Sequence, residues 1–261
     1  TKGGKVQDHM GAYLLESTES LLPAIVIPTT AGTGSEVTKV AVIADPDNDV
    51  KLPFAEEQFL PQLAILDPEM TVSMPPRLTA FTGMDALVHA IEAYVDKEWS
   101  PASDALALHA IKMITDNILQ ACDKPEDLQA RGAMQVGSFI AGVAFSHSMV
   151  GMVHGISHAL GGVYHIPHGL ANTLILPEVM EYNLEEKIDR YADVAMAMGV
   201  SFPTIVSDSQ SVIKSGALDL ISKTVKKTDI QPLKDLVDSK AHKIRDFANK
   251  KLENLGFVDG W

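Results

Sequence analysis

Five histidines lie in the most apolar part of this chain, where other ionisable side chains are missing. From Gly132 to Pro177 the sequence contains no Lys, Arg, Asp or Glu. The histidines of this stretch are His147, His154, His158, His165 and His168. Imidazole binds metals and transfers protons near neutral pH, so a cluster of histidines in an apolar stretch indicates a buried chemical site. The alternative for any single one is a hydrogen-bonded core histidine.

The spacing of these histidines repeats that of a carboxylate–histidine pair earlier in the chain. Asp85 and His89 are four residues apart in GMDALVHA. His154 and His158 repeat this spacing in VHGISHALG, and side chains so spaced share one face of a helix. His168 follows in PHGLAN, where Pro-His-Gly predicts the start of another helix. One carboxylate with several imidazoles suits Fe(II) or Zn(II), whereas Ca²⁺ and Mg²⁺ prefer oxygen ligands alone.

A second candidate site is the stretch PTTAGTGSEVT, residues 28–38, which directly follows the apolar run AIVI. Its glycines let the backbone approach a ligand closely, and its hydroxyls and free N–H groups suit phosphate oxygens. The alternative is a Ser/Thr-rich turn after a strand, because the stretch is neither a G-x-G-x-x-G fingerprint nor a P-loop. A phosphate-binding loop and a metal site that meet at a cleft suit a nucleotide-dependent enzyme acting on a small substrate.

The composition of the 261-residue chain restricts its partners and its location. The formal net charge is −13 and the pI is about 5.0, which argues against nucleic acid and against an anionic membrane as the main partner. The single cysteine, Cys122, suits a reducing compartment. The N-terminal residues lack the pattern of a signal peptide, so we expect a cytoplasmic protein. Within the uncharged stretch, the histidines, Gln135 and Asn172 favour a buried helical core over a membrane span.

Hydrophobic periodicity divides the chain near residues 74–76. Short β-branched runs bounded by turn residues predict strands at 24–29, 40–45 and 63–68. Apolar residues at three- and four-residue spacings predict helices at 78–95, 103–122, 125–145 and 184–199, and two or three amphipathic helices over 201–261. Ser103 and Pro125 are expected helix starts, and Gly199 an expected helix end. The predicted fold class is an α/β N-terminal piece followed by an all-α domain.

Three long segments resemble the iron-containing, or group III, alcohol dehydrogenases. They are PTTAGTGSEVT, MPPRLTAFTGMDALVHAIEAY, in which Met74 stands where the family often has Leu, and MVHGISHALGGVYHIPHGLANTLILPEVMEYN. The resemblance runs from about Leu22 to Gly199. Lactaldehyde reductase, 1,3-propanediol dehydrogenase and butanol dehydrogenase belong to this family.

The resemblance implies a role for each matching residue. His158 would be catalytic rather than a ligand and would assist proton transfer beside the nicotinamide, and Phe145 would line the substrate pocket. The metal, Fe(II) or alternatively Zn(II), would be held by Asp85, His89, His154 and His168. The cofactor, NAD or NADP, would be bound by Thr29, Thr30, Thr33, Thr38 and Lys51.

The resemblance also implies an activity and a domain organisation. The activity is hydride transfer between a small alcohol or diol and NAD(P), which interconverts alcohol and aldehyde or ketone and is carried out by a homo-oligomer. Residues 1–75 would form a partial Rossmann-like nucleotide domain, and residues 76–261 the helical metal and substrate domain.

The chain departs from the family in three places. It lacks the Gly-Gly-Gly-Ser turn of the nucleotide domain and the late Asn-Pro-Arg segment, and His147 stands where the family has Asn. The first departure indicates either a truncated sequence or an incomplete cofactor site. The alternative functions are a hydroxyacid–oxoacid transhydrogenase, a Zn-dependent polyol dehydrogenase on the same scaffold, or a metal-binding assembly subunit without turnover.

Overall fold

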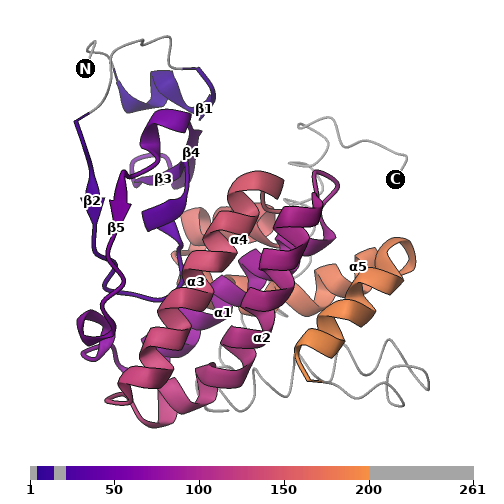
Figure 1. Ribbon diagram of the computed structural model, residues 1–261. Coiled ribbons are helices and arrows are strands. Elements are labelled where there is room, and N and C mark those ends of the chain that lie inside the picture. The colour runs from indigo at the N-terminus through magenta and orange to yellow at the C-terminus, as the bar shows by residue number, and fades with distance from the viewer. Residues whose placement is uncertain (1–4, 15–21, 200–261) are drawn as a thin grey trace.

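The computed structural model describes residues 5–14 and 22–199, so the helices expected over 201–261 lie outside the described residues. Figure 1 shows two regions side by side, a region of strands and short helices from the first part of the chain and a bundle of longer helices. In the described residues the last strand ends at Ala64 and the first α-helix begins at Pro76. The predicted fold class, an α/β piece followed by a helical region, is therefore confirmed.

The α/β region contains two small sheets. In the first, β3 (Val40–Asp45) pairs antiparallel with β4 (Val50–Ala55), and β1 (Gly11–Ala12) pairs parallel with β4, which gives the order β1-β4-β3. In the second, β2 (Ile25–Val26) pairs parallel with β5 (Leu63–Ala64). Short 3-10 helices cover Val6–His9, Ser35–Val37, Glu57–Phe59 and Pro68–Thr71.

The strands agree only in part with the expectation from sequence. The strand expected at 40–45 is confirmed with the same bounds. Those expected at 24–29 and 63–68 are two residues long, because prolines without an N–H donor flank both runs. β4 was not predicted, since Pro53 interrupts its apolar run; in the sheet Pro53 lies opposite Val42.

The helical region consists of α1 (Pro76–Val95), α2 (Pro101–Asp123), α3 (Leu128–Ser148), α4 (Met152–Tyr164) and α5 (His168–Ala197). Two of the expected starts are wrong. α2 begins at Pro101 because Ser100 caps it, with its hydroxyl accepting the N–H of Ser103. α3 begins at Leu128, three residues after Pro125, because the carboxylate of Asp127 accepts the first free N–H groups of the helix.

α5 is longer than expected. The predicted helix at 184–199 is the second part of α5, which begins at His168 and departs from helical geometry at Lys187. The start at His168 is confirmed. The expected end is confirmed as well, since the helix stops at Ala197 and Gly199 follows with φ +84°.

α1 lies at the centre of the helical region, since it packs against α2, α3 and α5. Its side chains from Thr79 to Tyr94 are buried with few exceptions, as expected for a helix that is apolar on all sides. Three of these buried side chains are acidic or imidazole groups, Asp85, His89 and Glu92. Their spacing of four and three residues places them on one face of the helix.

The uncharged stretch 132–177 forms most of α3, all of α4 and the first part of α5. It supplies core side chains such as Met134, Leu160 and Leu170, as expected for a buried helical core. No single helix among the described residues is long and apolar enough to cross a membrane. α3 and α4 meet the length and composition criteria only together, as a pair bent by 105°.

Two close backbone contacts join segments that are distant in the sequence: the start of α5 lies against α1, and the loop of residues 28–38 lies against α3. A Cβ on Gly169 would lie 2.0 Å from the carbonyl oxygen of Phe81, so only glycine lets the start of α5 rest on α1. A Cβ on Gly34, which has φ +62°, would lie 2.8 Å from the Cα of Gly142. The loop of residues 28–38 therefore lies against α3, next to the helical region.

Candidate metal centre

Three helices bring polar side chains to one place. α1, α4 and α5 each contribute two residues spaced by four positions, so that both side chains of a pair share one helix face. These pairs are Asp85 and His89, His154 and His158, and His168 and Asn172. α1 packs against α5, and α5 packs against α4, so the three faces meet.

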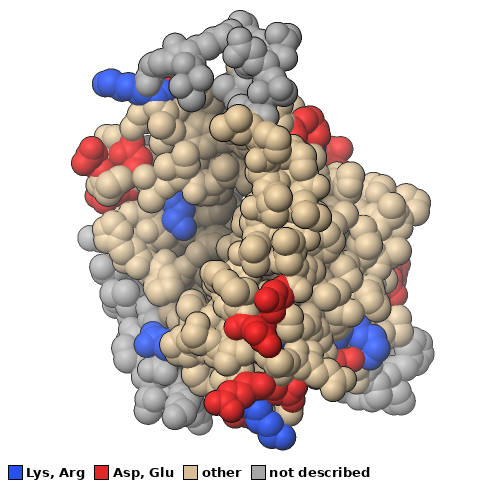
Figure 2. Space-filling view, turned by 60° about the vertical axis from the view of Figure 1, so that its left-hand side comes forward, with Lys and Arg blue, Asp and Glu red and all other residues tan. Residues whose placement is uncertain are grey.

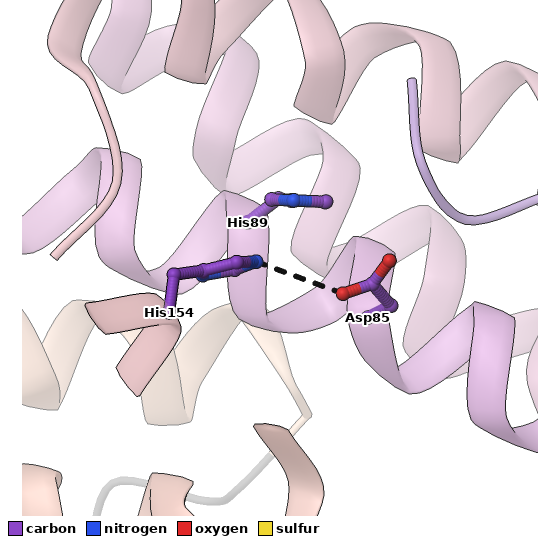
Figure 3. A group of neighbouring side chains, drawn as sticks. All are labelled: Asp85, His89 and His154. Carbon is purple, nitrogen blue, oxygen red and sulfur yellow. Dashed lines mark ion pairs between the residues drawn. The ribbon is translucent and has the colours of Figure 1, made fainter. Parts of the chain in front are cut away.

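Asp85, His89 and His154 form the buried centre of this group. One potential ligand atom from each lies within 4.8 Å of the others, and all three side chains are buried. The His89 and His154 rings are stacked, with centroids 4.4 Å apart and planes inclined by 16°. Figure 3 shows the two rings one above the other beside the Asp85 carboxylate, whose Oδ1 lies 3.6 Å from the Nε2 of His154.

His168 and His158 lie at the less buried side of the group. The Nε2 of His168 is 3.4 Å from the Oδ1 of Asp85, and its side chain is 27% exposed. The His158 ring is stacked on the His168 ring with centroids 5.0 Å apart and meets the His154 ring edge-on at 5.9 Å. The sequence-predicted residues Asp85, His89, His154, His158 and His168 are thus neighbours in the structure.

Asn172 belongs to the same group, although it was not predicted as a site residue. It is fully buried, and its Nδ2 donates a hydrogen bond to the Oδ1 of Asp85 at 2.6 Å. The same Nδ2 lies 3.1 Å from the Nε2 of His154 and 3.4 Å from that of His168. Its position four residues after His168 is the signal by which it could have been found.

Glu92 is a second residue without a predicted role. Its Oε2 lies 2.5 Å from the Nδ1 of His154, and its Oε1 accepts the backbone N–H of Val153 at 2.6 Å. Its side chain is 3% exposed. Its place three residues after His89, within an otherwise apolar stretch, is the sequence signal that was passed over.

Burial and neighbouring groups determine the charges of this cluster. Burial lowers the pKa of His89 to about 3 and that of His168 to about 4. Burial opposes ionisation of Asp85, but the neighbouring imidazoles, His89 foremost, outweigh it and lower the pKa. Burial also opposes protonation of His154, but hydrogen bonds to Asp85 and Glu92 outweigh it and raise the pKa to about 9.

The chemistry of these donors fits a divalent transition metal. A carboxylate and three imidazoles are ligands that Fe(II) and Zn(II) accept. The Nε2 atoms of His154 and His168 lie 3.6 Å and 3.4 Å from the same Oδ1 of Asp85, so these donors converge on one point. Such a concentration of ionisable groups in a protein core is typical of a functional site.

The remaining histidines of the uncharged stretch stand apart from this cluster. His147 is exposed near the end of α3, so the residue that departs from the family pattern is not one of the buried donors. His165 is also exposed, and its Nε2 lies 3.7 Å from an Oδ1 of Asp49.

The predicted cofactor loop lies beside α1. Gly32 contacts Thr82 of α1 so closely that a Cβ would lie 2.6 Å from its carbonyl oxygen. Thr29 and Thr33 are exposed, Thr30 is half-buried and Thr38 is buried. The Thr33 hydroxyl is hydrogen-bonded to Ser35 within the loop. The loop thus presents threonine side chains at a surface, and Thr82, its contact on α1, lies three residues before Asp85.

Lys51 and Phe145 approach the site from other elements. Lys51 of β4 lies against α4, where a Cβ on Gly161 would be 3.1 Å from its Nζ. Burial lowers the pKa of Lys51, and the charge of Asp85 opposes that shift. The Phe145 ring is stacked on His89 with centroids 4.4 Å apart, so it shields one side of the candidate ligands.

The surface near these elements is hollowed. Figure 2 shows a depression between the α/β region and the helices, with one basic side chain on its wall and mostly uncharged residues around it. A depression between two regions is the usual place for a small-molecule site. The fold and this cluster together form a candidate metal site with an adjoining Ser/Thr-rich loop.

Comparison with known proteins assigns the family. A model of the C-terminal part of the Fe-containing alcohol dehydrogenase family matches residues 79–258, and a model described as iron-containing alcohol dehydrogenase matches residues 1–68. The chain belongs to the iron-containing alcohol dehydrogenase family. The matched residues extend past the range from Leu22 to Gly199, so the resemblance is longer than its motifs indicated.

Individual relatives agree with this assignment. The chain is 45% identical to an NAD-dependent methanol dehydrogenase of Bacillus methanolicus, over 76% of this chain and 51% of that protein. It is 42% identical to a 1,3-propanediol dehydrogenase of Klebsiella pneumoniae, over 76% of this chain and 51% of that protein. A crystal structure of a 1,3-propanediol oxidoreductase superposes with a TM-score of 0.82 and 37% identity, covering 96% of this chain and 65% of the other. The chain spans about half the length of the curated relatives it matches.

Proposed function

We propose that this protein transfers a hydride between a small alcohol or diol and NAD(P), with a divalent metal at the α1–α4–α5 cluster. The observation that carries the proposal is the convergence of Asp85, His89 and His154, with His168 next to the carboxylate, in a core that holds few other ionisable groups. Membership of the family supports the reaction class, and the names of the relatives support small alcohols and diols as substrates.

The metal would be held by Asp85, His89, His154 and His168, and Fe(II) is the metal that the family name favours. When bound, such a metal supplies Lewis acidity toward the oxygen of the alcohol or carbonyl substrate. Asp85 contributes the negative charge, and the imidazoles contribute neutral nitrogen ligands. Asn172 holds the carboxylate in place through its hydrogen bond to Oδ1.

His158 would handle the proton of the reaction. Burial, with contributions from His168 and His154, lowers its pKa to about 3, so the ring is neutral at pH 7. In a neutral imidazole one nitrogen donates a hydrogen bond and the other accepts one, so the ring would relay a proton between two groups without storing it. Its stacking on His168 places this ring beside the candidate ligands at the less buried side of the cluster.

The nucleotide would bind along the loop of residues 28–38, within a nucleotide-binding part assigned to residues 1–75. Hydroxyls of Thr29 and Thr30 would bind phosphate or ribose oxygens, and that of Thr33 would do so by exchanging its hydrogen bond to Ser35. Lys51 supplies a positive charge between this region and α4. The NAD dependence named for the Bacillus methanolicus relative supports NAD as the first cofactor to test. Phe145 would keep water away from the buried face of the site through its stacking on His89.

The test is alcohol-dependent reduction of NAD⁺ and NADP⁺ by the full chain after anaerobic loading with Fe(II). Short primary alcohols and 1,2- and 1,3-diols are the substrates, and the Asp85→Asn variant is the matched control for the metal. Turnover that requires both Fe(II) and Asp85 is the expected result. Stoichiometric metal binding without turnover on any of these alcohols would contradict the proposed reaction but would still support the proposed metal site.

A further inference from the structure

Glu92 contacts His154 on the side of the ring that faces away from Asp85. The Oε2 of Glu92 lies 2.5 Å from the Nδ1 of His154, while the Nε2 of the same ring faces Asp85 Oδ1 at 3.6 Å. A carboxylate only accepts hydrogen bonds, so this contact requires a proton on Nδ1. A bound metal would displace any proton from Nε2, the nitrogen that faces Asp85, so the lone pair offered to the proposed metal is the one on Nε2.

The second oxygen of Glu92 fixes the carboxylate itself. Oε1 accepts the N–H of Val153 in the first turn of α4, one residue before His154. A negative charge at a helix N-terminus also interacts favourably with the helix dipole. Gly151 lies so close that a Cβ would be 2.9 Å from Oε1. The carboxylate is thus clamped between the backbone and the ring of one turn, so it cannot rotate without breaking a hydrogen bond.

We infer that Glu92 is a positioning residue, which holds His154 in the Nδ1–H form and directs its Nε2 into the metal centre. The inference rests on the proposed metal site. In the described residues, the ion-pair partner of the buried Glu92 is His154, and a buried carboxylate without a lysine or arginine partner is costly. A role at a metal ligand accounts for this arrangement, since ligating histidines commonly donate their second N–H to a carboxylate.

Glu92→Gln tests the proton arrangement with little change of shape. If the amide oxygen accepts the Val153 N–H, the amide NH₂ faces the Nδ1 of His154. That nitrogen must then lose its proton to become an acceptor, and the proton moves to Nε2, where it blocks coordination. Glu92→Asp keeps the charge but is one methylene shorter, so it separates loss of positioning from loss of negative charge. Glu98→Gln removes an exposed carboxylate from the loop after α1 and is the matched control.

The experiment measures Zn(II) affinity of the full chain by competition with a chromophoric chelator. Both Glu92→Gln and Glu92→Asp are expected to weaken binding by about 10- to 100-fold, the usual effect of removing a partner of a metal ligand. Glu98→Gln is expected to bind as the unchanged protein does. Thermal unfolding of the metal-free variants checks that they fold.

A second readout does not depend on affinity. In the Zn(II)-bound protein, the proton on Nδ1 of His154 is expected to give a downfield, slowly exchanging NMR resonance because of its short hydrogen bond to a carboxylate. Glu92→Gln should move this resonance upfield or remove it. Unchanged affinity in either Glu92 variant, or an unchanged resonance in Glu92→Gln, would overturn the inference. Absence of Zn(II) binding by the unchanged protein would instead contradict the proposed metal site.

Discussion

Gly169 faces the carbonyl oxygen of Phe81 with no room for a side chain, since a Cβ there would lie 2.0 Å from that oxygen. This contact sets the position of His168, the first residue of α5. Gly169→Ala must push α5 away from α1 and therefore separate His168 from Asp85. Overpacking of this kind costs about 1–3 kcal/mol, so we expect lower stability in urea unfolding together with weaker Zn(II) binding.

Gly155→Ala is the matched control for this substitution. Gly155 lies in α4, and a Cβ there would meet nothing within 4 Å. Alanine is favoured over glycine in a helix by up to about 1 kcal/mol, so the control should be as stable as the unchanged protein or more stable. Equal stability of the two variants would mean that α5 yields to the added methyl group without cost.

Asn172→Ala removes the hydrogen bond that Asp85 accepts at 2.6 Å. Without metal, the buried carboxylate loses a neutral donor, and a hydrogen bond to a charged group contributes about 1.5–3 kcal/mol. With saturating Zn(II), the metal balances the carboxylate charge, so Asn172→Ala should lower the free energy of unfolding by less. Urea unfolding with chelator and with Zn(II) measures both values. The control is Asn117→Ala in α2, where the amide donates to the Met113 carbonyl. This substitution should lower the free energy of unfolding equally with chelator and with Zn(II).

Zn(II) is expected to raise the melting temperature of the protein. A ligand that binds only the folded state at 100 times its dissociation constant adds about 2.7 kcal/mol to the free energy of unfolding. Asp85→Asn should abolish this shift because it removes the anionic ligand. His165→Asn should keep it, since His165 is exposed and tolerates Asn at its φ of +54°. Equal shifts in all three proteins would place the bound metal elsewhere.

Gly161→Ala tests the assignment of Lys51 to the cofactor. The added Cβ would lie 3.1 Å from the Lys51 Nζ, so the amine must shift by a few tenths of an ångström. We expect the KM for NAD(P) to rise by about threefold to tenfold, which corresponds to about 0.7–1.4 kcal/mol, with a smaller change in kcat. Gly155→Ala serves again as the control, because it changes helix propensity in the same helix away from Lys51. A KM that follows the control would remove Lys51 from the cofactor site.

The elements with strong local signals were predictable from the sequence. α1 and α2 have long apolar repeats, and β3 is a compact β-branched run, so their existence was evident. The helix starts were missed where a better cap lies nearby, as with Ser100 and Asp127. β4 was missed because its partners, β3 and β1, compensate for Pro53 in a way that a local pattern does not reveal.

The candidate site likewise contains residues that local spacing reveals and residues whose partners lie on distant segments. Asp85 and His154 were identified as candidates because four-residue spacings are visible within one helix. Glu92 was not, because its partner is His154, 62 residues further along the chain. Asn172 was treated only as a polar residue of the uncharged stretch, since its contact with Asp85 joins residues 87 positions apart. Local spacing does place Glu92 and Asn172 on the same helix faces as His89 and His168. Their partners, however, lie on other helices, and those contacts arise only from packing.

The candidate ligands come from α1, α4 and α5, with all of α2 and α3 lying between the first two of these helices in the chain. The complete set of ligands therefore exists only after segments distant in sequence have packed. An ion that needs the complete set of ligands would bind the packed helices and not a chain in which they are still apart. Its kinetic effect would fall on the unfolding rate, so that the protein persists longer in the folded state without reaching it sooner.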